Sequence, residues 1–341
     1  MKALCTAAPG EYGLVERPMP EPAADEALVK VASAGLCHTD VIIRDGLAGH
    51  VRYPVIPGHE FSAVVETCGP AVKGLEPGDR VAVESILWCG RCTPCRKGDT
   101  TGCENYDELG SKRDGGFAEY CTVPARHLVK LPEHVTLEEA ALAEPLANAV
   151  SAVRQSDVKL GERVAIIGPG AIGLMAVRAA RLANPSTLVL VGTRDERLAL
   201  GKAFGATHTV NIKRDGALEE LKDILGGRGA DVTIECAGTR SAVELALDIV
   251  GWRGRVAIEG GTATGGPVAL SLQMLQERSA RVMGICGWLT ADFARALELL
   301  SNGLVDVKPL ITHTFSLDEW EAAFDMITRR KSEAMKVVFA P

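Results

Sequence analysis

Short runs of alternating apolar and polar residues fill roughly the first 150 residues, with Gly and Pro between them every few positions. Such alternation predicts strands that bury one face, and the Gly and Pro residues predict the turns that join them. The predicted strands cover residues 28–32, 63–67, 80–84, 117–123 and 128–131. We therefore expect a β-barrel-like domain whose long loops carry functional side chains.

From residue 138 onward, apolar positions recur at helical spacing, and strands alternate with helices. A helix is predicted at residues 138–152. Further along, β-branched apolar runs predict strands at 164–167, 187–191, 209–212, 231–236, 255–259 and 281–285. This alternation predicts a parallel, doubly wound sheet, in which the loops at the carboxyl ends of the strands face the ligand.

The last part of the chain returns to a mixed pattern. It contains an amphipathic helix at 291–300, a second helix that ends near residue 329, and a strand at 336–339. At 341 residues the chain is long enough for two domains with separate cores. The whole pattern predicts an α/β protein with one mainly β domain and one parallel-sheet domain.

A glycine-rich turn follows the first strand of the predicted parallel sheet. It reads Gly168-Pro169-Gly170-Ala171-Ile172-Gly173. In G-x-G-x-x-G the first glycine permits a tight turn, the second lets a pyrophosphate approach the backbone, and the third lets the helix pack on the strand. The free N–H groups at the helix start attract phosphate charge. Because strand, helix and strand come in the right order, the motif predicts a dinucleotide site rather than an ordinary turn.

The residues after the second strand of this sheet bear on the choice of cofactor. NAD-binding proteins often place an acidic residue there to bind the adenosine ribose, whereas this chain has Gly192, Thr193 and Arg194. Gly192 would leave room for a 2′-phosphate, Thr193 can donate a hydrogen bond, and Arg194 can make a bidentate charged contact. Asp195 is the rival ribose ligand, although it is better placed to cap the helix predicted at 196–204. The sequence therefore favours NADP over NAD.

Three more loops follow predicted strands of the same sheet and are candidates for the nicotinamide end of the cofactor. They are Ala237-Gly238, Gly260-Gly261 and Ile285-Cys286. Gly260 and Gly261 could equally be ordinary turn glycines.

Composition and charge exclude several other classes of function. Hydrophobic residues make up 47% of the chain and charged residues 24%, as in ordinary globular proteins. The net charge of −7 gives no electrostatic basis for binding nucleic acid or an anionic membrane. The N-terminus lacks the apolar stretch of a signal peptide, and no apolar run is long enough to span a bilayer. We expect a cytoplasmic protein with neither a membrane nor a nucleic-acid partner.

Ten cysteines in such a chain indicate metal ligands and free thiols rather than disulfides. Four of them are close in sequence: Cys89, Cys92, Cys95 and Cys103. Four thiolates at this spacing suit a closed, tetrahedral structural zinc site. An iron–sulfur cluster is the alternative, although the last spacing misses that of bacterial ferredoxins. Bound zinc would stabilise residues 88–105, which have little apolar core of their own.

The other cysteines are expected to be unligated thiols, with one exception. Cys37 lies in the predicted loop 35–40, and His59 and Glu60 lie in the predicted loop 57–60. A thiolate, an imidazole and a carboxylate are ligands that zinc accepts. Each residue alone is more often a buried thiol or a hydrogen-bonded polar group. Their combination with the four-cysteine segment indicates a second metal site.

Five sequence features occur in order along the chain: Cys37-His38-Thr39-Asp40, Gly58-His59-Glu60, Gly78-Asp79-Arg80-Val81, the four cysteines and the glycine-rich turn. In this combination the whole chain resembles the zinc-containing medium-chain dehydrogenase/reductase superfamily, which includes the alcohol dehydrogenases. Glu144-Pro145 is similar to the sorbitol and threonine dehydrogenase branch, where a Glu takes part in the catalytic zinc site. The resemblance implies a GroES-like catalytic domain at 1–152 and 291–341 and a Rossmann domain at 153–290, with the active site between them.

The resemblance also implies two zinc ions per chain and a role for each site residue. Cys37, His59 and a carboxylate would hold the catalytic zinc, with Glu60 and Glu144 ligating directly, through water or in alternation. The metal would act as a Lewis acid toward the substrate hydroxyl, and the nicotinamide would take the hydride. Thr39 matches the hydroxyl that relays the proton, although it could instead bond to the backbone.

On the adenosine side, Arg197 matches a second basic residue of the superfamily, although it could be an ordinary solvated helix residue. Relatives are dimers or tetramers, so the resemblance implies a homodimer or homotetramer.

Two positions depart from the superfamily pattern. The relay His that commonly follows the ligand Cys by five residues is Ile42 here, so the proton would leave through the cofactor ribose, water or another side chain. Sorbitol dehydrogenases carry an Arg for substrate hydroxyls where this chain has Cys286-Gly287-Trp288, which predicts a more apolar pocket. Trp88 and Phe61 are further candidates for the pocket wall.

The sequence thus predicts a zinc-dependent, NADP-preferring dehydrogenase of a small secondary alcohol or polyol, or of the matching ketone. An NAD-dependent threonine or sugar-alcohol dehydrogenase is the nearest alternative. A zinc-free quinone or enone reductase is another class, and the two sets of metal donors argue against it. A non-catalytic cofactor-binding protein is the last class, and the joint presence of Cys37, Thr39, His59 and Glu144 argues against it.

Overall fold

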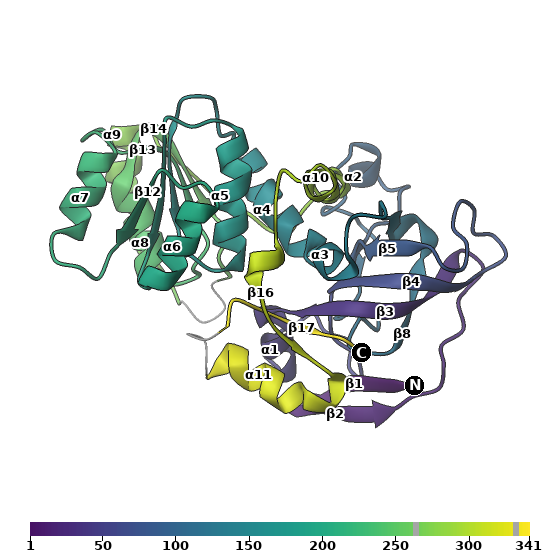
Figure 1. The fold of residues 1–341 in the computed structure, drawn as a ribbon. Coiled ribbons are helices and arrows are strands. Elements are labelled where there is room, and N and C mark those ends of the chain that lie inside the picture. Colours follow the sequence, from purple (N-terminus) through teal and green to yellow (C-terminus); the bar gives the residue numbers. More distant parts are fainter. Residues whose placement is uncertain (262–265, 330–333) are drawn as a thin grey trace. The chain divides into compact units, whose positions relative to one another are not determined.

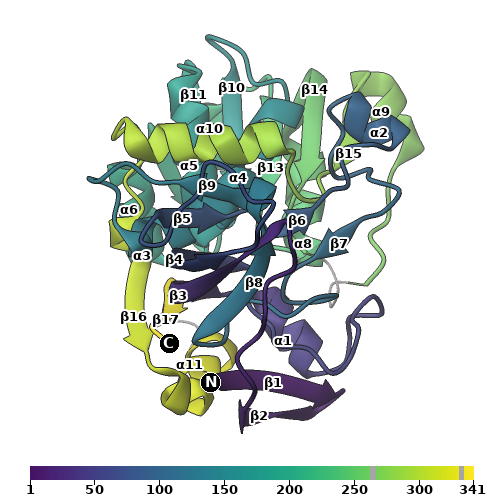
Figure 2. The ribbon, with the colours of Figure 1, turned by 90° about the vertical axis from the view of Figure 1, so that its right-hand side faces the viewer.

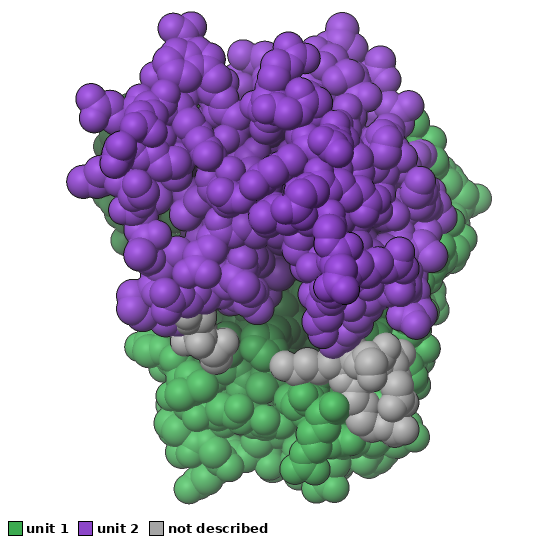
Figure 3. Space-filling model, turned by 90° about the vertical axis from the view of Figure 1, so that its left-hand side faces the viewer, with its two compact units in different colours: residues 1–145, 289–341 green, residues 146–288 purple. Residues whose placement is uncertain are grey.

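Two compact units make up the chain in the computed structural model, which describes residues 1–261, 266–329 and 334–341. One unit contains Met1–Pro145 and Leu289–Pro341, and the other contains Leu146–Trp288 (Figure 3). The first boundary falls inside helix α4 (Ala143–Gln155), earlier than the boundary at residue 152 that the resemblance implies.

The first unit is organised around the long strand β3 (Glu26–Leu36). Its antiparallel partners are β4 (Glu60–Cys68), β8 (Tyr120–Pro124) and β17 (Lys336–Phe339). The sheet continues beyond β4 to β5 (Arg80–Val83) and β9 (Leu128–Lys130), and beyond β17 to β16 (Ile311–Phe315). Figures 1 and 2 show β16 and β17 beside β3, so the C-terminal tail completes a sheet that begins near the N-terminus.

Smaller elements complete this unit. Its remaining strands and helices are β1 (Lys2–Ala8), β2 (Glu11–Glu16), β6 (Ile86–Leu87), β7 (Asp107–Glu108), α1 (His38–Arg44), α2 (Thr93–Arg96), α3 (Leu137–Ala141), α10 (Thr290–Ser301) and α11 (Trp320–Thr328). Apolar side chains from many of the strands form one core, in which Phe117 and Phe339 meet edge to face at 4.9 Å. Burial of such aromatic side chains is a main stabilising contribution to a β domain.

The predicted strands of the first part are confirmed, with shifted ends. The strand predicted at 28–32 is longer at both ends because β3 has paired neighbours along its whole length. Residues 138–152 are helical as predicted, but the prediction of a single helix is wrong, because a turn at Leu142 divides the segment into α3 and α4. Thr136 caps α3 by accepting a hydrogen bond from the N–H of Glu139 at 3.2 Å.

In its described residues, the second unit has one six-stranded, fully parallel sheet with helices between the strands (Figure 1). Its strands, in their order across the sheet, are β12 (His208–Asn211), β11 (Thr187–Gly192), β10 (Arg163–Ile167), β13 (Ala230–Glu235), β14 (Val250–Ile258) and β15 (Arg281–Gly284). Its complete helices are α5 (Ala171–Leu182), α6 (Asp195–Ala203), α7 (Ala217–Ile224), α8 (Arg240–Ile249) and α9 (Leu272–Arg278). The predicted doubly wound sheet is confirmed.

The strand order places the ligand-binding edge of this sheet. Successive strands run outward from β10 in one direction as far as β12, and the chain then returns to β13 on the other side of β10. Doubly wound sheets bind their ligands at such a reversal, beyond the carboxyl ends of the strands. The loops after β10 and β13 therefore flank the expected cofactor position. Among the described residues, no helix combines the length and the apolar composition that crossing a membrane requires.

Candidate catalytic metal site and cofactor site

The strand register of the first unit brings the predicted catalytic donors together. Gly35 of β3 pairs with Glu60 of β4, so Cys37, just after β3, lies near His59 and Glu60. One sulfur, one imidazole nitrogen and one carboxylate oxygen from these three residues all lie within 4.8 Å of one another. A single small cation can contact three donors at such separations. The three donors predicted from separate loops thus form one cluster.

Asp40 holds this cluster in shape, although its role is not predicted from the sequence. Its side chain is fully buried. Oδ2 accepts a hydrogen bond from the N–H of Cys37 at 2.8 Å, and Oδ1 accepts one from the N–H of Gly58 at 3.2 Å. Oδ1 also lies 3.6 Å from Nδ1 of His59. A carboxylate behind a ligating histidine fixes its ring orientation and tautomer. The signal for this role was present in the sequence, as the acidic residue that follows Cys37 by three positions.

The charges around His59 test whether the cluster suits a cation. Burial disfavours the charged imidazole, but Asp40 and Cys37 outweigh it and raise the pKa of His59 well above its ordinary value. The surroundings therefore favour positive charge at the centre of the cluster. A divalent metal ion supplies such charge and displaces the proton, because zinc binds neutral imidazole. The donor set and its charge both fit a zinc ion.

The other predicted catalytic residues lie around this cluster. Thr39 Oγ1 is 3.6 Å from Cys37 Sγ, so its hydroxyl is next to the donors. Glu144 is buried in the first turn of α4. Among the described residues, the donor group with mutual distances within 4.8 Å consists of Cys37, His59 and Glu60 and does not include Glu144. Lys336, which is also not among the predicted site residues, forms a buried ion pair with Glu60. Burial would lower the pKa of Lys336, but Glu60 and Cys37 raise it above its ordinary value.

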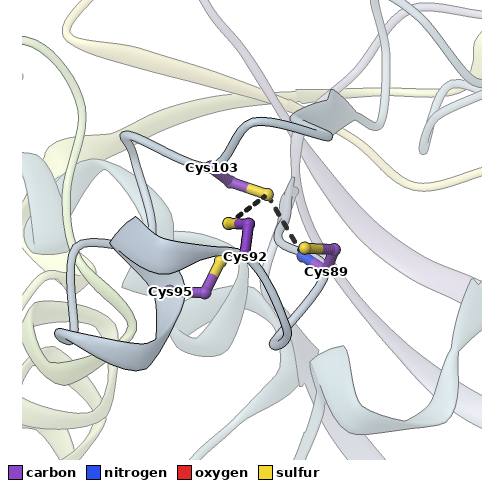
Figure 4. Close-up of side chains that lie close together, drawn as sticks. All are labelled: Cys89, Cys92, Cys95 and Cys103. Atoms are coloured by element: carbon purple, nitrogen blue, oxygen red, sulfur yellow. Dashed lines mark hydrogen bonds between the residues drawn. The ribbon is translucent and has the colours of Figure 1, made fainter.

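The four clustered cysteines form a second metal-ligand group, between β6 and β7. Their sulfurs all lie within 4.8 Å of one another, and Figure 4 shows the four side chains facing a common centre. Cys92 Sγ is 3.9 Å from Cys103 Sγ, which accepts a hydrogen bond from the N–H of Cys89 at 3.3 Å. The N–H groups of Arg91 and Cys92 lower the pKa of Cys89 to about 5. A thiolate is the form that binds metal, so this backbone arrangement favours a ligand.

The glycine-rich turn has the geometry that its pattern predicts. Gly168 has φ +104°, and a Cβ at Gly173 would overlap the carbonyl oxygen of Gly168. Gly170 precedes the first residue of α5, and a Cβ there would meet nothing within 4 Å. The backbone at the start of α5 is therefore open to a ligand, with free N–H groups and the positive end of the helix dipole. Ala171 and Ile172 form the first turn of this helix.

The structure changes the interpretation of two residues at the adenosine end. A Cβ at Gly192 would lie 2.5 Å from Cγ of Pro169, so Gly192 is small because it packs on the glycine-rich turn. Asp195 was predicted to cap the helix, but this prediction is wrong. Arg194 is the N-cap residue, and Asp195 is the first residue of α6. Its carboxylate accepts hydrogen bonds from Asn211 Nδ2 at 2.8 Å and Arg214 at 3.0 Å. Both bonds are made to Oδ1 of the carboxylate that the rival interpretation assigned to the ribose.

Two arginines gather at this end of the second unit. Burial, together with the positive charge of the nearby Arg194, lowers the pKa of Arg197. Thr193, just before Arg194, is exposed. An anion that lies between two guanidinium groups reduces the electrostatic repulsion between them.

The remaining predicted residues follow the ends of β14 and β15. Gly260 and Gly261 come just after β14, where the N–H of Gly260 donates to the carbonyl of Glu235 at 2.9 Å. Ile285 is buried and Cys286 is exposed after β15. Phe61, a candidate above for the apolar pocket wall, instead belongs to the buried core of the first unit, while Trp288 is fully buried and Trp88 is partly buried. Large aromatic side chains stay buried because their transfer from water is favourable.

Proteins of similar sequence and structure identify the family of this chain. The family model of the alcohol dehydrogenase GroES-like domain matches residues 23–133, and that of the zinc-binding dehydrogenase matches residues 171–302. A sorbitol dehydrogenase of Bacillus subtilis is 33% identical over 100% of this chain and 97% of its own length. The chain belongs to the zinc-dependent medium-chain dehydrogenase/reductase superfamily.

Two further relatives support the assignment of this chain to the zinc-dependent medium-chain dehydrogenases. An L-threonine 3-dehydrogenase of Bacillus velezensis is 36% identical over 96% of this chain and 95% of its own. The crystal structure of a putative zinc-binding dehydrogenase from Sinorhizobium meliloti, bound to NADP, has a TM-score of 0.92 and 34% identity, covering 100% of this chain and 99% of that one. The first unit is the GroES-like part of the enzyme and the second is its Rossmann domain. The protein is therefore an enzyme of the alcohol, polyol and threonine dehydrogenase group that uses NAD(P).

Proposed function

We propose that this enzyme is a zinc-dependent, NADP-preferring dehydrogenase that oxidises a small secondary alcohol or polyol, or reduces the matching ketone. The convergence of Cys37, His59 and Glu60 within 4.8 Å carries the proposal. When bound, zinc supplies Lewis acidity toward the substrate oxygen, and the nicotinamide exchanges a hydride with the carbinol carbon.

The residues of the chain have separate tasks in this scheme. Cys37 and His59 would hold the metal, and Asp40 keeps the imidazole oriented through Nδ1. Thr39, with its hydroxyl 3.6 Å from Cys37 Sγ, would take the proton that leaves the substrate hydroxyl. Ile42 offers no titratable group for the next step, so the proton would continue through the cofactor ribose or water. Cys89, Cys92, Cys95 and Cys103 would hold a second, structural zinc ion.

A chelation experiment tests this function as a whole. Turnover is measured with a panel of secondary alcohols, sorbitol and L-threonine, with NADP and with NAD, before and after incubation with dipicolinate. We expect NADP-dependent oxidation of a secondary alcohol or polyol that dipicolinate abolishes and added zinc restores. Turnover that survives complete metal removal would contradict the proposal and favour the zinc-free reductases.

A second candidate, an NAD-dependent threonine dehydrogenase, is favoured by the 36% identity to a relative of that name. In the same experiment, oxidation of L-threonine with NAD alone would select it over the first candidate.

The NADP preference depends on the two neighbouring arginines, Arg194 and Arg197. Replacing Arg194 by alanine removes a charged hydrogen-bond donor, which we value at about 2 kcal/mol. We expect the KM for NADP to rise about 30-fold, since each 1.36 kcal/mol corresponds to a factor of ten. The KM for NAD should change about twofold or less, because NAD lacks the 2′-phosphate.

Arg240→Ala is the matched control, because Arg240 is an exposed arginine at the start of another helix of the same unit, paired with Glu244. It should leave both KM values unchanged. An unchanged KM for NADP in Arg194→Ala would show that this arginine does not bind the phosphate.

A further inference from the structure

A serine on helix α4 holds the loop that follows strand β15. Ser151 is fully buried, and its hydroxyl donates a hydrogen bond to the carbonyl oxygen of Gly287 at 2.9 Å. Both residues belong to the second compact unit. They are 136 residues apart in the chain, so this bond is a tertiary contact and not part of the helix. It fixes a stretch of backbone at the edge of the sheet where the cofactor is expected.

A glutamine one turn further along α4 completes this arrangement. Gln155 Nε2 donates a hydrogen bond to Ser151 Oγ at 2.9 Å. A hydroxyl has one proton to donate, whereas its oxygen can accept other bonds. The oxygen of Ser151 accepts from the amide of Gln155, and its proton points at the Gly287 carbonyl. Hydrogen bonds that are linked in this way strengthen one another.

A second buried serine nearby shows the local alternative. The hydroxyl of Ser156, which directly follows α4, donates to the carbonyl oxygen of Ala152, one turn earlier in the same helix. Serine commonly satisfies its hydroxyl in this way. Ser151 instead bonds to a carbonyl in a distant loop. The bond of Ser156 constrains only its own helix, whereas the bond of Ser151 constrains the loop after β15.

This loop is held on both sides of one exposed residue, Cys286. Before it, the N–H of Ile285 donates to the carbonyl of Ile258 at 2.8 Å. After it, Gly287 has φ +62°, a left-handed conformation that favours glycine, and its carbonyl accepts the bond from Ser151. The backbone around Cys286 is therefore held in one conformation at the carboxyl end of a parallel strand.

We propose that Ser151 is a positioning residue for the nicotinamide: by holding the Gly287 carbonyl, it keeps the backbone of residues 285–287 in the conformation that receives the nicotinamide ring. Ser151 acts through this loop and not by touching the cofactor. Hydride transfer depends on close alignment of the ring with the substrate carbon, so the conformation of the loop affects the rate as well as the affinity. This inference rests on the proposed function, since it requires a nicotinamide cofactor with its ring at Ile285 and Cys286.

Two probes that differ only at the nicotinamide end provide the test. Calorimetry measures the affinity of the protein for NADPH and for 2′-phospho-ADP-ribose, which has the same adenosine end and the same phosphates but no nicotinamide. In Ser151→Ala the Gly287 carbonyl loses its donor, and the loop no longer has a fixed conformation. We expect the affinity for NADPH to fall about tenfold and the affinity for the fragment to change by about twofold or less.

Substitution of the exposed Gln155 tests the same bond without changing the buried serine. Gln155→Glu replaces the amide donor by a carboxylate, which only accepts hydrogen bonds. The carboxylate would take the proton of Ser151 away from Gly287, so we expect the same selective loss of affinity for NADPH. Both probes carry the same phosphates, so the added negative charge affects them alike.

Two further variants serve as controls. Gln155→Ala leaves the hydroxyl of Ser151 bonded to Gly287, and both affinities should stay within about twofold of those of the unmodified protein. Ser156→Ala removes an equally buried hydroxyl whose bond lies within its own helix, and it should leave both affinities unchanged.

The outcomes distinguish the role of Ser151 from the proposed function. An unchanged affinity for NADPH in Ser151→Ala, or an equal loss for both probes, would overturn the role of Ser151. Gln155→Glu decides the question in the same way where Ser151→Ala does not fold. If the unmodified protein prefers NAD, NADH and ADP-ribose replace the two probes. If it binds neither NADPH nor NADH, the proposed function itself is wrong.

Discussion

Replacing His59 by alanine is expected to lower kcat/KM for the alcohol by about a thousandfold or more. The substitution removes one of the donors that converge within 4.8 Å, and with it the metal that would polarise the substrate oxygen. A metal acting as a Lewis acid contributes several kcal/mol, and about 4 kcal/mol corresponds to three factors of ten. The zinc content should fall by one ion per chain, as measured by elemental analysis beside the steady-state kinetics.

His208→Ala is a suitable control for this variant, because His208 is exposed at the start of β12 in the other unit. It should keep the zinc content and the activity. Full zinc content and undiminished turnover in His59→Ala would contradict the assignment of His59 as a ligand. Circular dichroism would show whether the fold is intact, so that a loss of activity is not mistaken for unfolding.

Replacing Cys103 by serine is expected to have the largest effect on stability. Cys103 and Cys92 are the buried members of the four-cysteine cluster, and the segment around them has a single short helix, α2. Structural zinc supplies folding free energy directly in such segments. If about 4 kcal/mol is lost, the Tm of a domain of this size should fall by about 10 °C. Calorimetry and zinc analysis should show this decrease together with the loss of one zinc ion per chain.

Cys68→Ser provides the comparison. Cys68 is a half-buried thiol at the end of β4, and its sulfur contacts the carbonyl oxygen of Leu75 at 3.7 Å. We expect its replacement to keep both zinc ions and to change the Tm little. A Cys103→Ser protein with the unmodified zinc content and Tm would show that the four cysteines hold no structural metal.

The candidate structural-zinc ligands and the glycine-rich turn could be predicted from the sequence because their signals are local. The spacing of the four cysteines lies within one short segment, and the structure places all four sulfurs together. The glycine-rich turn was also identified correctly, because strand, turn and helix are adjacent in the chain. Periodicity depends on near neighbours, so the parallel sheet followed from the alternation of its strands and helices.

Relationships between distant segments could only come from the tertiary structure. Asp195 was expected to cap its helix, but Asn211 and Arg214 bind it. Phe61 was a candidate for the pocket wall, but the alternation of side chains along β4 directs it into the core.

The same limit explains why two residues beside the candidate metal donors, Asp40 and Lys336, were not predicted from the sequence. Asp40 binds the N–H groups of Cys37 and Gly58, which belong to different loops. Lys336 reaches Glu60 from the opposite end of the chain, because β17 pairs with β3. The sequence determined which donors are present and which type of sheet forms. The register between strands far apart in the chain decided which charges surround those donors, because pairing across a sheet depends on long-range packing that no local pattern records.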